Sequence, residues 1–180
     1  MMDCKRSKVR LAALALAMVS SPVLGAEVYL APEKFLAESF GGEAPKPSTL
    51  WIAGETRYAV ERILGHSAGA LRVRYWSQEG RTAWILEEIG KTEPITTGIV
   101  VDKGAIARIS VLVYRESRGW EVRYAFFTDQ FKGATLTALR ELDRNIDGIS
   151  GATLSVRALT RLARVALLLD AEVRKARTSR

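Results

Sequence analysis

The sequence predicts an α+β protein, in which a mostly antiparallel sheet packs against a long C-terminal helix and short helices lie near the N-terminus. Residues 70–124 contain runs of alternating apolar and polar side chains separated by turn residues, a pattern typical of antiparallel strands. Residues 153–174 instead repeat apolar side chains at helical spacing. The chain has 180 residues, of which 48% are hydrophobic and 26% charged, so its size and composition indicate one globular domain with its own core.

The first 26 residues predict a secretory signal peptide. A basic stretch precedes the apolar run 11–24, and the small residues Gly25 and Ala26 follow. The run is shorter than the roughly 20 residues that span a bilayer, although an uncleaved membrane anchor and a buried helix remain alternatives. We therefore expect residues 27–180 to form the mature domain in the periplasm, where it can also associate with the membrane. The basic residues are Lys5, Arg6, Lys8 and Arg10.

Charge and rare residues exclude several function classes. The net charge of +7 becomes +4 without the four basic residues and Asp3 of the signal, and it is spread along the chain, so we expect no nucleic-acid partner. Cys4 is the only cysteine and lies in the signal, which leaves no thiolate ligand in the mature domain. His66 is the only histidine, and we expect it at the surface or capping a helix. No metal site and no catalytic residue are predicted.

The expected elements follow from periodicity and turn residues. We expect two short helices that end at Gly41 and Gly65. Trp76, Trp84 and the strand tyrosines are expected to serve core and cross-strand packing. The segments are helices at 31–40 and 55–64, a loop at 42–48, strands at 71–75, 82–89, 95–101, 106–114 and 120–124, a turn at 102–104, and a short helix at 136–142.

The last expected helix carries two different faces. One is an apolar stripe that faces a core. The other is basic, and we expect it to be solvated, with Arg157 near the helix start as the exception that is a candidate phosphate contact. The stripe comprises Leu154, Ala158, Leu162, Val165 and Leu169, and the basic face comprises Arg157, Arg161 and Arg164.

The segment Asp147-Gly-Ile-Ser-Gly-Ala-Thr153 stands directly before this helix. The first backbone N–H groups of a helix have no internal partners and favour an anion, and glycines let backbone approach a ligand closely. Ser150 and Thr153 add hydroxyl groups. Residue chemistry alone therefore predicts either a phosphate site or an ordinary Ser/Thr helix cap.

This run resembles the flavinylation motif D-x-x-S/T-G-A-T of FMN-binding domains, a family that includes the periplasmic FMN-carrying subunits of the Na⁺-translocating NADH:quinone reductase and of the Rnf electron-transport complex. In that family a flavin transferase moves FMN from FAD onto the last threonine as a phosphoester. The resemblance implies covalent FMN on Thr153. The other motif positions that it implies in cofactor binding are Asp147, Gly148, Ser150, Gly151 and Ala152.

Weaker matches lie upstream, so the resemblance covers about residues 90–169. Gly90-Lys-Thr-Glu-Pro-Ile95 resembles the family's G-x-x-x-P-I, and 130–133 resembles a following F-x-G segment. The stretch 116–121 is a looser match to E-T-P-G-L-G, because serine stands for threonine and arginine for proline. By resemblance, Glu116, Ser117 and Gly119 border the flavin ring; the alternative is an ordinary loop at the end of a hairpin.

The resemblance implies an exported flavoprotein that transfers electrons in an extracytoplasmic or membrane-associated redox chain, with FMN as its cofactor. Its implied partners are a flavin transferase and a membrane redox protein. Such a protein is an electron carrier or reductase component rather than a stand-alone enzyme. The alternative is an exported binding or interaction module that has the same fold and no flavin. A serine hydrolase is disfavoured, because Ser150 lies in G-I-S-G-A and not in G-x-S-x-G.

Overall fold

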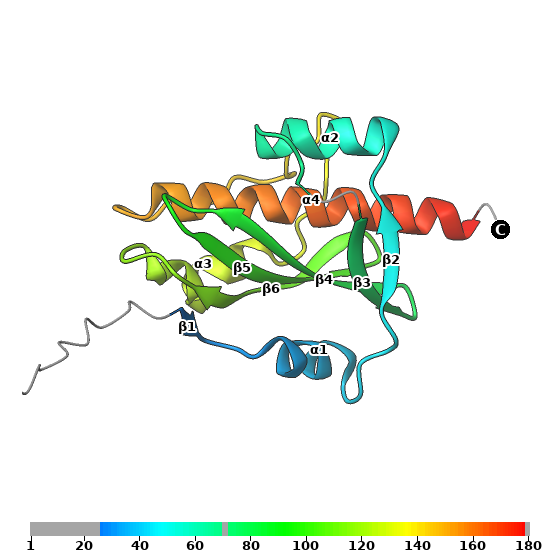
Figure 1. Cartoon of the computed structure of the whole chain (residues 1–180), viewed down its shortest axis with the longest axis horizontal. Helices are drawn as coiled ribbons and strands as arrows, with labels where there is room; N and C mark the ends of the chain where they lie inside the picture. Colours follow the sequence, from blue (N-terminus) through cyan, green and yellow to red (C-terminus); the bar gives the residue numbers. More distant parts are fainter. Residues whose placement is uncertain (1–25, 70–71, 179–180) are drawn as a thin grey trace, which may run out of the picture.

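The computed structural model describes residues 26–69 and 72–178, which form one antiparallel sheet with the strand order β1-β6-β5-β4-β3-β2 and several helices (Figure 1). The signal-peptide prediction therefore lies almost wholly outside the described residues. The strands are β1 (Glu27–Val28), β2 (Ser48–Trp51), β3 (Arg72–Gln78), β4 (Arg81–Ile89), β5 (Pro94–Asp102) and β6 (Ala105–Tyr114). The helices are α1 (Pro32–Phe40), α2 (Gly54–Leu64), α3 (Ala125–Thr128) and α4 (Thr153–Thr178), with 3₁₀ turns η1 (Trp120–Arg123) and η2 (Asp129–Phe131).

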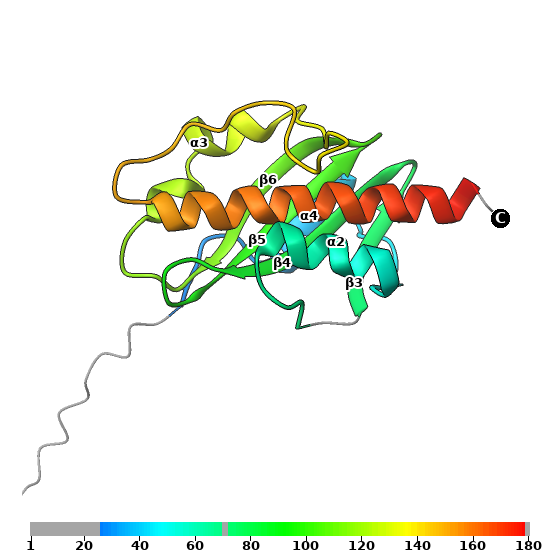
Figure 2. The same ribbon diagram turned by 90° about the horizontal axis from the view of Figure 1, so that it is seen from above.

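The sheet is covered on both faces. The long helix α4 runs across one face with α2 beside it, whereas α1 lies against the other face (Figures 1 and 2). The larger core cluster fills the α4 side and includes Trp84, Ile99 and Leu162. The smaller cluster joins Phe35 and Leu36 of α1 to the opposite face. This arrangement confirms the expected α+β fold.

Most expected elements are present with small shifts of their ends. Gly41 and Gly65 end α1 and α2 in the left-handed conformation, with φ of 71° and 77°. Lys103 and Gly104 also have positive φ, as a tight hairpin turn between β5 and β6 requires. Tyr75 stacks on its cross-strand partner Trp84 with ring centroids 5.1 Å apart, which confirms the packing role.

A buried polar network fixes α4 on the sheet. The Thr82 hydroxyl donates to the Asp170 carboxylate at 2.7 Å, and the indole N–H of Trp84 donates to the Thr82 hydroxyl at 3.0 Å. Arg174 donates to the same carboxylate at 2.8 Å. Because Asp170 is fully buried, these bonds replace the water that its carboxylate loses. The network therefore sets the position of α4 along the sheet.

The strand expected at 120–124 is wrong, because this segment is the 3₁₀ turn η1. Gly119 has φ of 85° and turns the chain away from the sheet after β6. The outer edge of β6 is also taken, since Glu27 and Val28 of β1 pair with Tyr114 and Val113. No edge of β6 is left for a further strand at this point.

The helix expected at 136–142 is also wrong. Leu136 and Leu142 form an isolated antiparallel bridge, and Arg140 between them has φ of 63°, which no right-handed helix contains. The hydroxyl of Thr137 accepts a hydrogen bond from the N–H of Glu141 at 3.2 Å and closes the loop. The sequence pattern also missed β1, β2, α3 and η2, all of which are short.

Candidate flavin site at the start of α4

The candidate site is the turn that leads into α4. Gly151 has φ of 81°, and the N–H of Ala152 donates to the Ile149 carbonyl at 3.0 Å, so the chain closes a tight turn before the helix. Ala152 is buried at 3% exposure and anchors the turn, whereas Thr153 is exposed. The turn therefore presents the Thr153 side chain to solvent at the first residue of α4. The other exposed residues of the motif are Asp147, Gly148, Ser150 and Gly151.

The first turn of α4 offers unpaired donors. Within the described chain, no protein oxygen accepts a hydrogen bond from the N–H groups of Thr153, Leu154 or Ser155. A Cβ added at Gly148 or Gly151 would meet no atom within 4 Å, so the space beside the turn is open. Free amides at a positive helix end, beside exposed hydroxyls, fit the phosphate group of FMN.

Leu154 does not belong to the buried stripe of α4. Its side chain is 43% exposed, whereas Ala158, Leu162, Val165 and Leu169 are buried as expected. The prediction for Leu154 was wrong, because the buried side chains at the start of α4 are those of Ser155 and Val156 instead. Leu154 consequently adds an apolar group to the surface next to Thr153.

Tyr114 and Ser155 bring the end of β6 to the start of α4. The Tyr114 hydroxyl donates to the carbonyl of Arg118 at 2.6 Å, so the Ser155 hydroxyl, 2.9 Å away, must donate to Tyr114. Burial raises the pKa of Tyr114, although the bond to Ser155 acts in the opposite direction. Neither residue was predicted from the sequence, since a strand tyrosine and a helix serine carry no local sign of this bond.

Gly119 lies against the same helix start. A Cβ at this position would come within 2.8 Å of the Ser155 hydroxyl, 2.9 Å of the Tyr114 hydroxyl and 3.3 Å of the Ala152 Cβ. The structure thus brings Gly119 next to the motif. Its missing side chain allows the loop 115–119 to pack closely on α4. Ser117 is exposed on this loop.

Glu116, in the same loop, binds the backbone of the turn between β4 and β5. Its Oε1 accepts hydrogen bonds from the backbone N–H groups of Lys91, Thr92 at 2.7 Å and Glu93 at 2.9 Å. Burial raises the pKa of Glu116, but these N–H groups outweigh it and the net pKa is lowered. The carboxylate therefore holds the turn between β4 and β5.

Gln130 connects η2 to the beginning of the motif. Its side-chain oxygen accepts a hydrogen bond from the N–H of Asp147 at 2.7 Å, and its side-chain nitrogen lies 3.5 Å from the Phe126 carbonyl. The motif is therefore attached to the protein both at Asp147 and at Ala152. Gln130 lies in the segment matched to F-x-G, but the resemblance gave it no role, because its partner is a backbone group 17 residues away.

The basic face of α4 is only partly solvated. Arg157, the candidate phosphate contact, is exposed near the start of α4. Arg161 lies 3.4 Å from the buried carboxylate of Glu88, which also bonds His66 at 3.0 Å. Half of the His66 side chain is exposed, which agrees with the expected surface position. Neither Arg161 nor His66 lies in the motif, so both act in the fold around Glu88.

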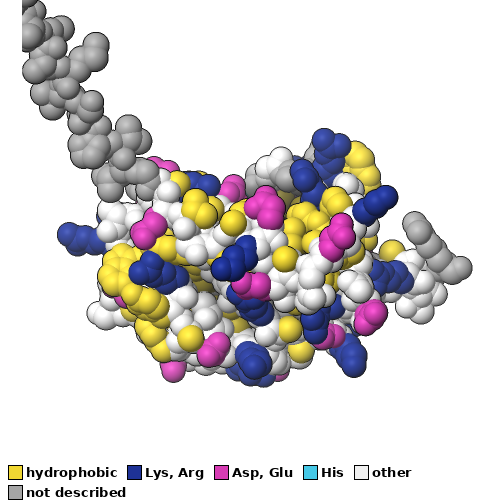
Figure 3. Space-filling view, turned by 90° about the horizontal axis from the view of Figure 1, so that it is seen from below, with side chains coloured by type: hydrophobic (Ala, Val, Ile, Leu, Met, Phe, Trp, Pro, Cys, Tyr) yellow, Lys and Arg dark blue, Asp and Glu magenta, His cyan; other side chains and the backbone are white. Residues whose placement is uncertain are grey.

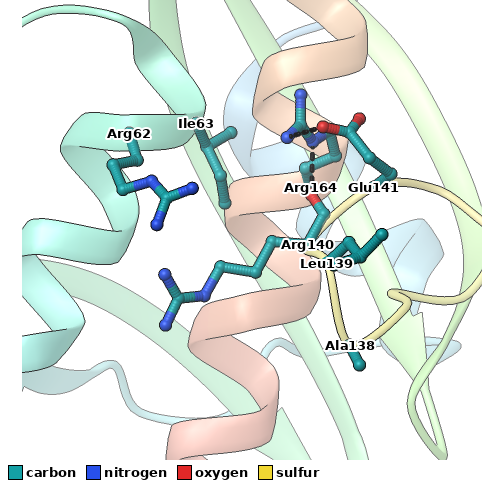
Figure 4. Close-up of a pocket in the computed structure, with 7 residues that line it drawn as sticks. All are labelled: Arg62, Ile63, Ala138, Leu139, Arg140, Glu141 and Arg164. Atoms are coloured by element: carbon teal, nitrogen blue, oxygen red, sulfur yellow. Dashed lines mark hydrogen bonds and ion pairs between the residues drawn. The ribbon is translucent and has the colours of Figure 1, made fainter.

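A separate pocket of about 360 Å³ lies between α2, α4 and the loop 138–141 (Figure 4). Arg164 of α4 donates to the Arg140 carbonyl and to the Glu141 carboxylate, each at 2.6 Å. The side chains of Arg62 and Arg140 extend into the same space in Figure 4. None of the motif residues lines this pocket. The bonds of Arg164 hold the loop that precedes the motif against α4.

The residues that the structure describes contain neither a candidate membrane-spanning helix nor a candidate metal site. None of their helices has the length and apolar character that a membrane crossing requires. Their His, Cys, Asp and Glu side chains form no group of three that could hold a metal ion.

Together, the fold and the site define an α+β domain that presents a threonine hydroxyl and free amides at the start of its last helix. Residues 90–168 match the family model described as FMN-binding domain, which confirms the resemblance. The match covers less than half of the chain and supports FMN binding by this segment, with FMN as the cofactor. No curated protein and no solved structure gives a significant match. The matched segment starts at the turn held by Glu116 and includes β5, β6, the motif and the first two-thirds of α4.

Proposed function

We propose that the protein carries FMN as a phosphoester on Thr153 and transfers electrons outside the cytoplasm. The observation that carries the proposal is the position of Thr153 within the FMN-binding domain. Its exposed side chain stands at the first residue of α4, next to three backbone N–H groups without a protein acceptor. A phosphate ester at this hydroxyl meets the positive end of the helix.

The attachment is a phosphoryl transfer from FAD, made by a flavin transferase. The Thr153 oxygen forms a bond to the FMN phosphorus, the pyrophosphate bond of FAD breaks, AMP leaves, and the hydroxyl proton is released. An acceptor in a second enzyme's active site must protrude, and the exposed residues around Thr153 satisfy that condition. Asp147, which is exposed at the start of the motif, is available to the same enzyme.

Covalent attachment suits an exported carrier, because a flavin that is held only by weak contacts is lost by diffusion. The bound flavin supplies the redox chemistry, and the protein supplies position and electrostatics. We infer that a membrane redox protein exchanges electrons with it in the periplasm. A cut after Ala26 leaves Glu27 and Val28, so the pairing of β1 with β6 survives removal of the signal.

The test is co-expression with a flavin transferase, followed by intact mass and in-gel flavin fluorescence. We expect a mature chain beginning at Glu27 with one added FMN less one water. Thr153→Ala abolishes the label, and Thr49→Ala, the matched loss of an exposed threonine hydroxyl on β2, retains it. A labelled Thr153→Ala chain, or an unlabelled wild type, would refute the proposal. An intact mass that corresponds to a chain still containing residues 1–26 would refute cleavage of the signal.

A further inference from the structure

Three aromatic side chains lie exposed within one short segment, residues 120–126. Trp120, Tyr124 and Phe126 are 40%, 41% and 62% exposed. Trp120 meets Tyr124 edge-on with centroids 5.7 Å apart, and Tyr124 lies 6.2 Å from Phe126. In Figure 3, hydrophobic side chains gather at the left end of the molecule, the end where α3 and β1 lie in Figure 1. Clustered exposed aromatic surface of this kind marks a binding site more often than chance placement.

The segment is rigidly anchored, so its exposed rings are not a loose tail. Val122 within the segment and Phe127 directly after it are fully buried, and the Phe127 ring packs edge-on against the Phe131 ring with centroids 5.5 Å apart. The chain therefore directs some of its apolar residues into the core and holds the others outside. The outer rings keep a fixed place on the surface.

The aromatic segment lies beside the flavin attachment turn, because both of its ends contact that turn. At one end Gly119, which directly precedes Trp120, packs against Ala152 and Ser155. At the other end Gln130 accepts a hydrogen bond from Asp147. Figure 2 agrees, since the coil that leads into α4 passes close to α3. A group tethered to Thr153 therefore has Trp120 and Tyr124 within its surroundings.

Arg123 places a positive charge among these rings. Its guanidinium carbon lies 5.2 Å from the Trp120 centroid, 5.0 Å from the Tyr124 centroid and 4.1 Å from the Tyr29 centroid. It also donates to the Tyr124 hydroxyl at 3.3 Å, while its ion pair with the exposed Glu27 is long, at 3.7 Å. The charge is thus held by aromatic faces and is only weakly neutralised.

We propose that Trp120 and Tyr124 form the stacking surface for the isoalloxazine ring of the FMN on Thr153, and that Arg123 provides the positive charge beside that ring. The proposal rests on the attachment at Thr153. The ribityl chain separates the phosphate from the flat ring, so a phosphate at the helix start leaves the ring to find a neighbouring surface. Flat aromatic faces suit such a ring, because stacking removes apolar area from water.

Two consequences can be measured on the labelled protein. A tryptophan in contact with a flavin quenches the flavin's fluorescence by electron transfer, so a stacked ring is dim. A nearby guanidinium favours the reduced ring, which gains negative charge, and thereby raises the reduction potential. Neither effect is expected if the ring points into solvent.

The experiment compares Trp120→Leu with Trp51→Leu in protein labelled by the transferase. Trp51 is the control because it is 67% exposed on β2, the edge strand on the far side of the sheet from β1 and β6. Intact mass first establishes equal labelling. We expect the flavin fluorescence yield to rise several-fold in Trp120→Leu and to stay unchanged in Trp51→Leu. Equal yields in both variants and the wild type, at equal labelling, overturn the stacking surface.

A second arm tests the charge. Arg123→Gln is compared with Arg72→Gln, an exposed arginine on β3, by spectroelectrochemical titration of the labelled protein. We expect a more negative potential in Arg123→Gln only. Equal potentials overturn the role of Arg123. If the wild type carries no flavin by mass, the proposed function fails and this inference falls with it, so the two failures are distinguished.

Discussion

The hydroxyl of Ser155 donates a hydrogen bond to the hydroxyl of Tyr114 across 2.9 Å, and this bond joins the first turn of α4 to the end of β6. Tyr114 in turn donates to the Arg118 carbonyl, so the loop 115–119, the strand and the helix start share one buried chain of donors. The turn 147–153 is therefore held in place by residues outside the motif.

Tyr114→Phe and Ser155→Ala are each expected to lower the free energy of unfolding by about 1–2 kcal/mol, because each removes the buried hydrogen bond between the two hydroxyls. Denaturant unfolding measures the loss. The double variant is expected to lose less than the two single losses combined, since both variants break the same bond. Additive losses would show that the Tyr114–Ser155 bond does not couple strand and helix.

Gly119→Ala is expected to destabilise the protein by about 1–3 kcal/mol, since an alanine with φ near 85° is strained and its Cβ would press on Ser155 and Tyr114. Gly148→Ala is the matched control, because a Cβ at Gly148 meets no atom within 4 Å. Thermal or denaturant unfolding compares the two. Equal stability of both variants would contradict the close packing of Gly119 on α4.

Glu116→Gln is expected to remove part of the acid sensitivity of folding. The pKa of Glu116 is lowered in the folded protein, so its contribution is present above the ordinary carboxyl pKa and is lost as pH falls through the lowered value. Between about pH 5 and about pH 3 the wild type should lose stability more steeply than Glu116→Gln. Glu43→Gln, at an exposed position, controls for the charge change. Parallel profiles for Glu116→Gln and the wild type would contradict the role of the 91–93 turn.

His66 is expected to titrate above its ordinary pKa of about 6.5. The Ser67 carbonyl and then the Glu88 carboxylate raise its pKa, while the charge of Arg161 lowers it. Its stabilising effect is therefore complete at low pH and is lost as pH rises through the raised pKa. Because His66 is the only histidine, one NMR titration follows it without assignment. Arg161→Gln should raise the pKa of His66 further. A His66 pKa below the ordinary value in the wild type would refute the pairing with Glu88.

The fold class and the motif were predictable because their physical causes are local. The spacing of apolar residues such as Ala158, Leu162 and Leu169 matches a helix that faces a core, and all three are buried. Asp102-Lys-Gly104 supplied the positive φ angles of a hairpin turn. The run from Asp147 to Thr153 indicated the family through its resemblance to the flavinylation motif, whereas its glycines and hydroxyls alone indicated a phosphate site or a helix cap.

The failures share a cause that is not local. The alternation at 120–124 predicted a strand, yet strand formation needs a free sheet edge, and Glu27 and Val28 occupy the edge of β6 beside Tyr114. The helix expected at 136–142 lost to a loop whose Arg140 carbonyl is bonded by Arg164, 24 residues away. Neither the pairing of β1 with β6 nor the bond from Arg164 can be predicted from the local sequence of the segment concerned.

The sequence by itself determined which residues form a helix, which turn precedes it and which hydroxyl ends the motif, because backbone sterics and side-chain periodicity act over a few neighbouring residues. Only the tertiary structure decided what surrounds Thr153. The turn 147–153 and the first turn of α4 are contacted by Gly119, Tyr114 and Gln130, which lie far from them in the chain. Such contacts depend on how α4 lies on the sheet. The same packing left Trp120 and Tyr124 at the surface, where periodicity had placed them in a strand.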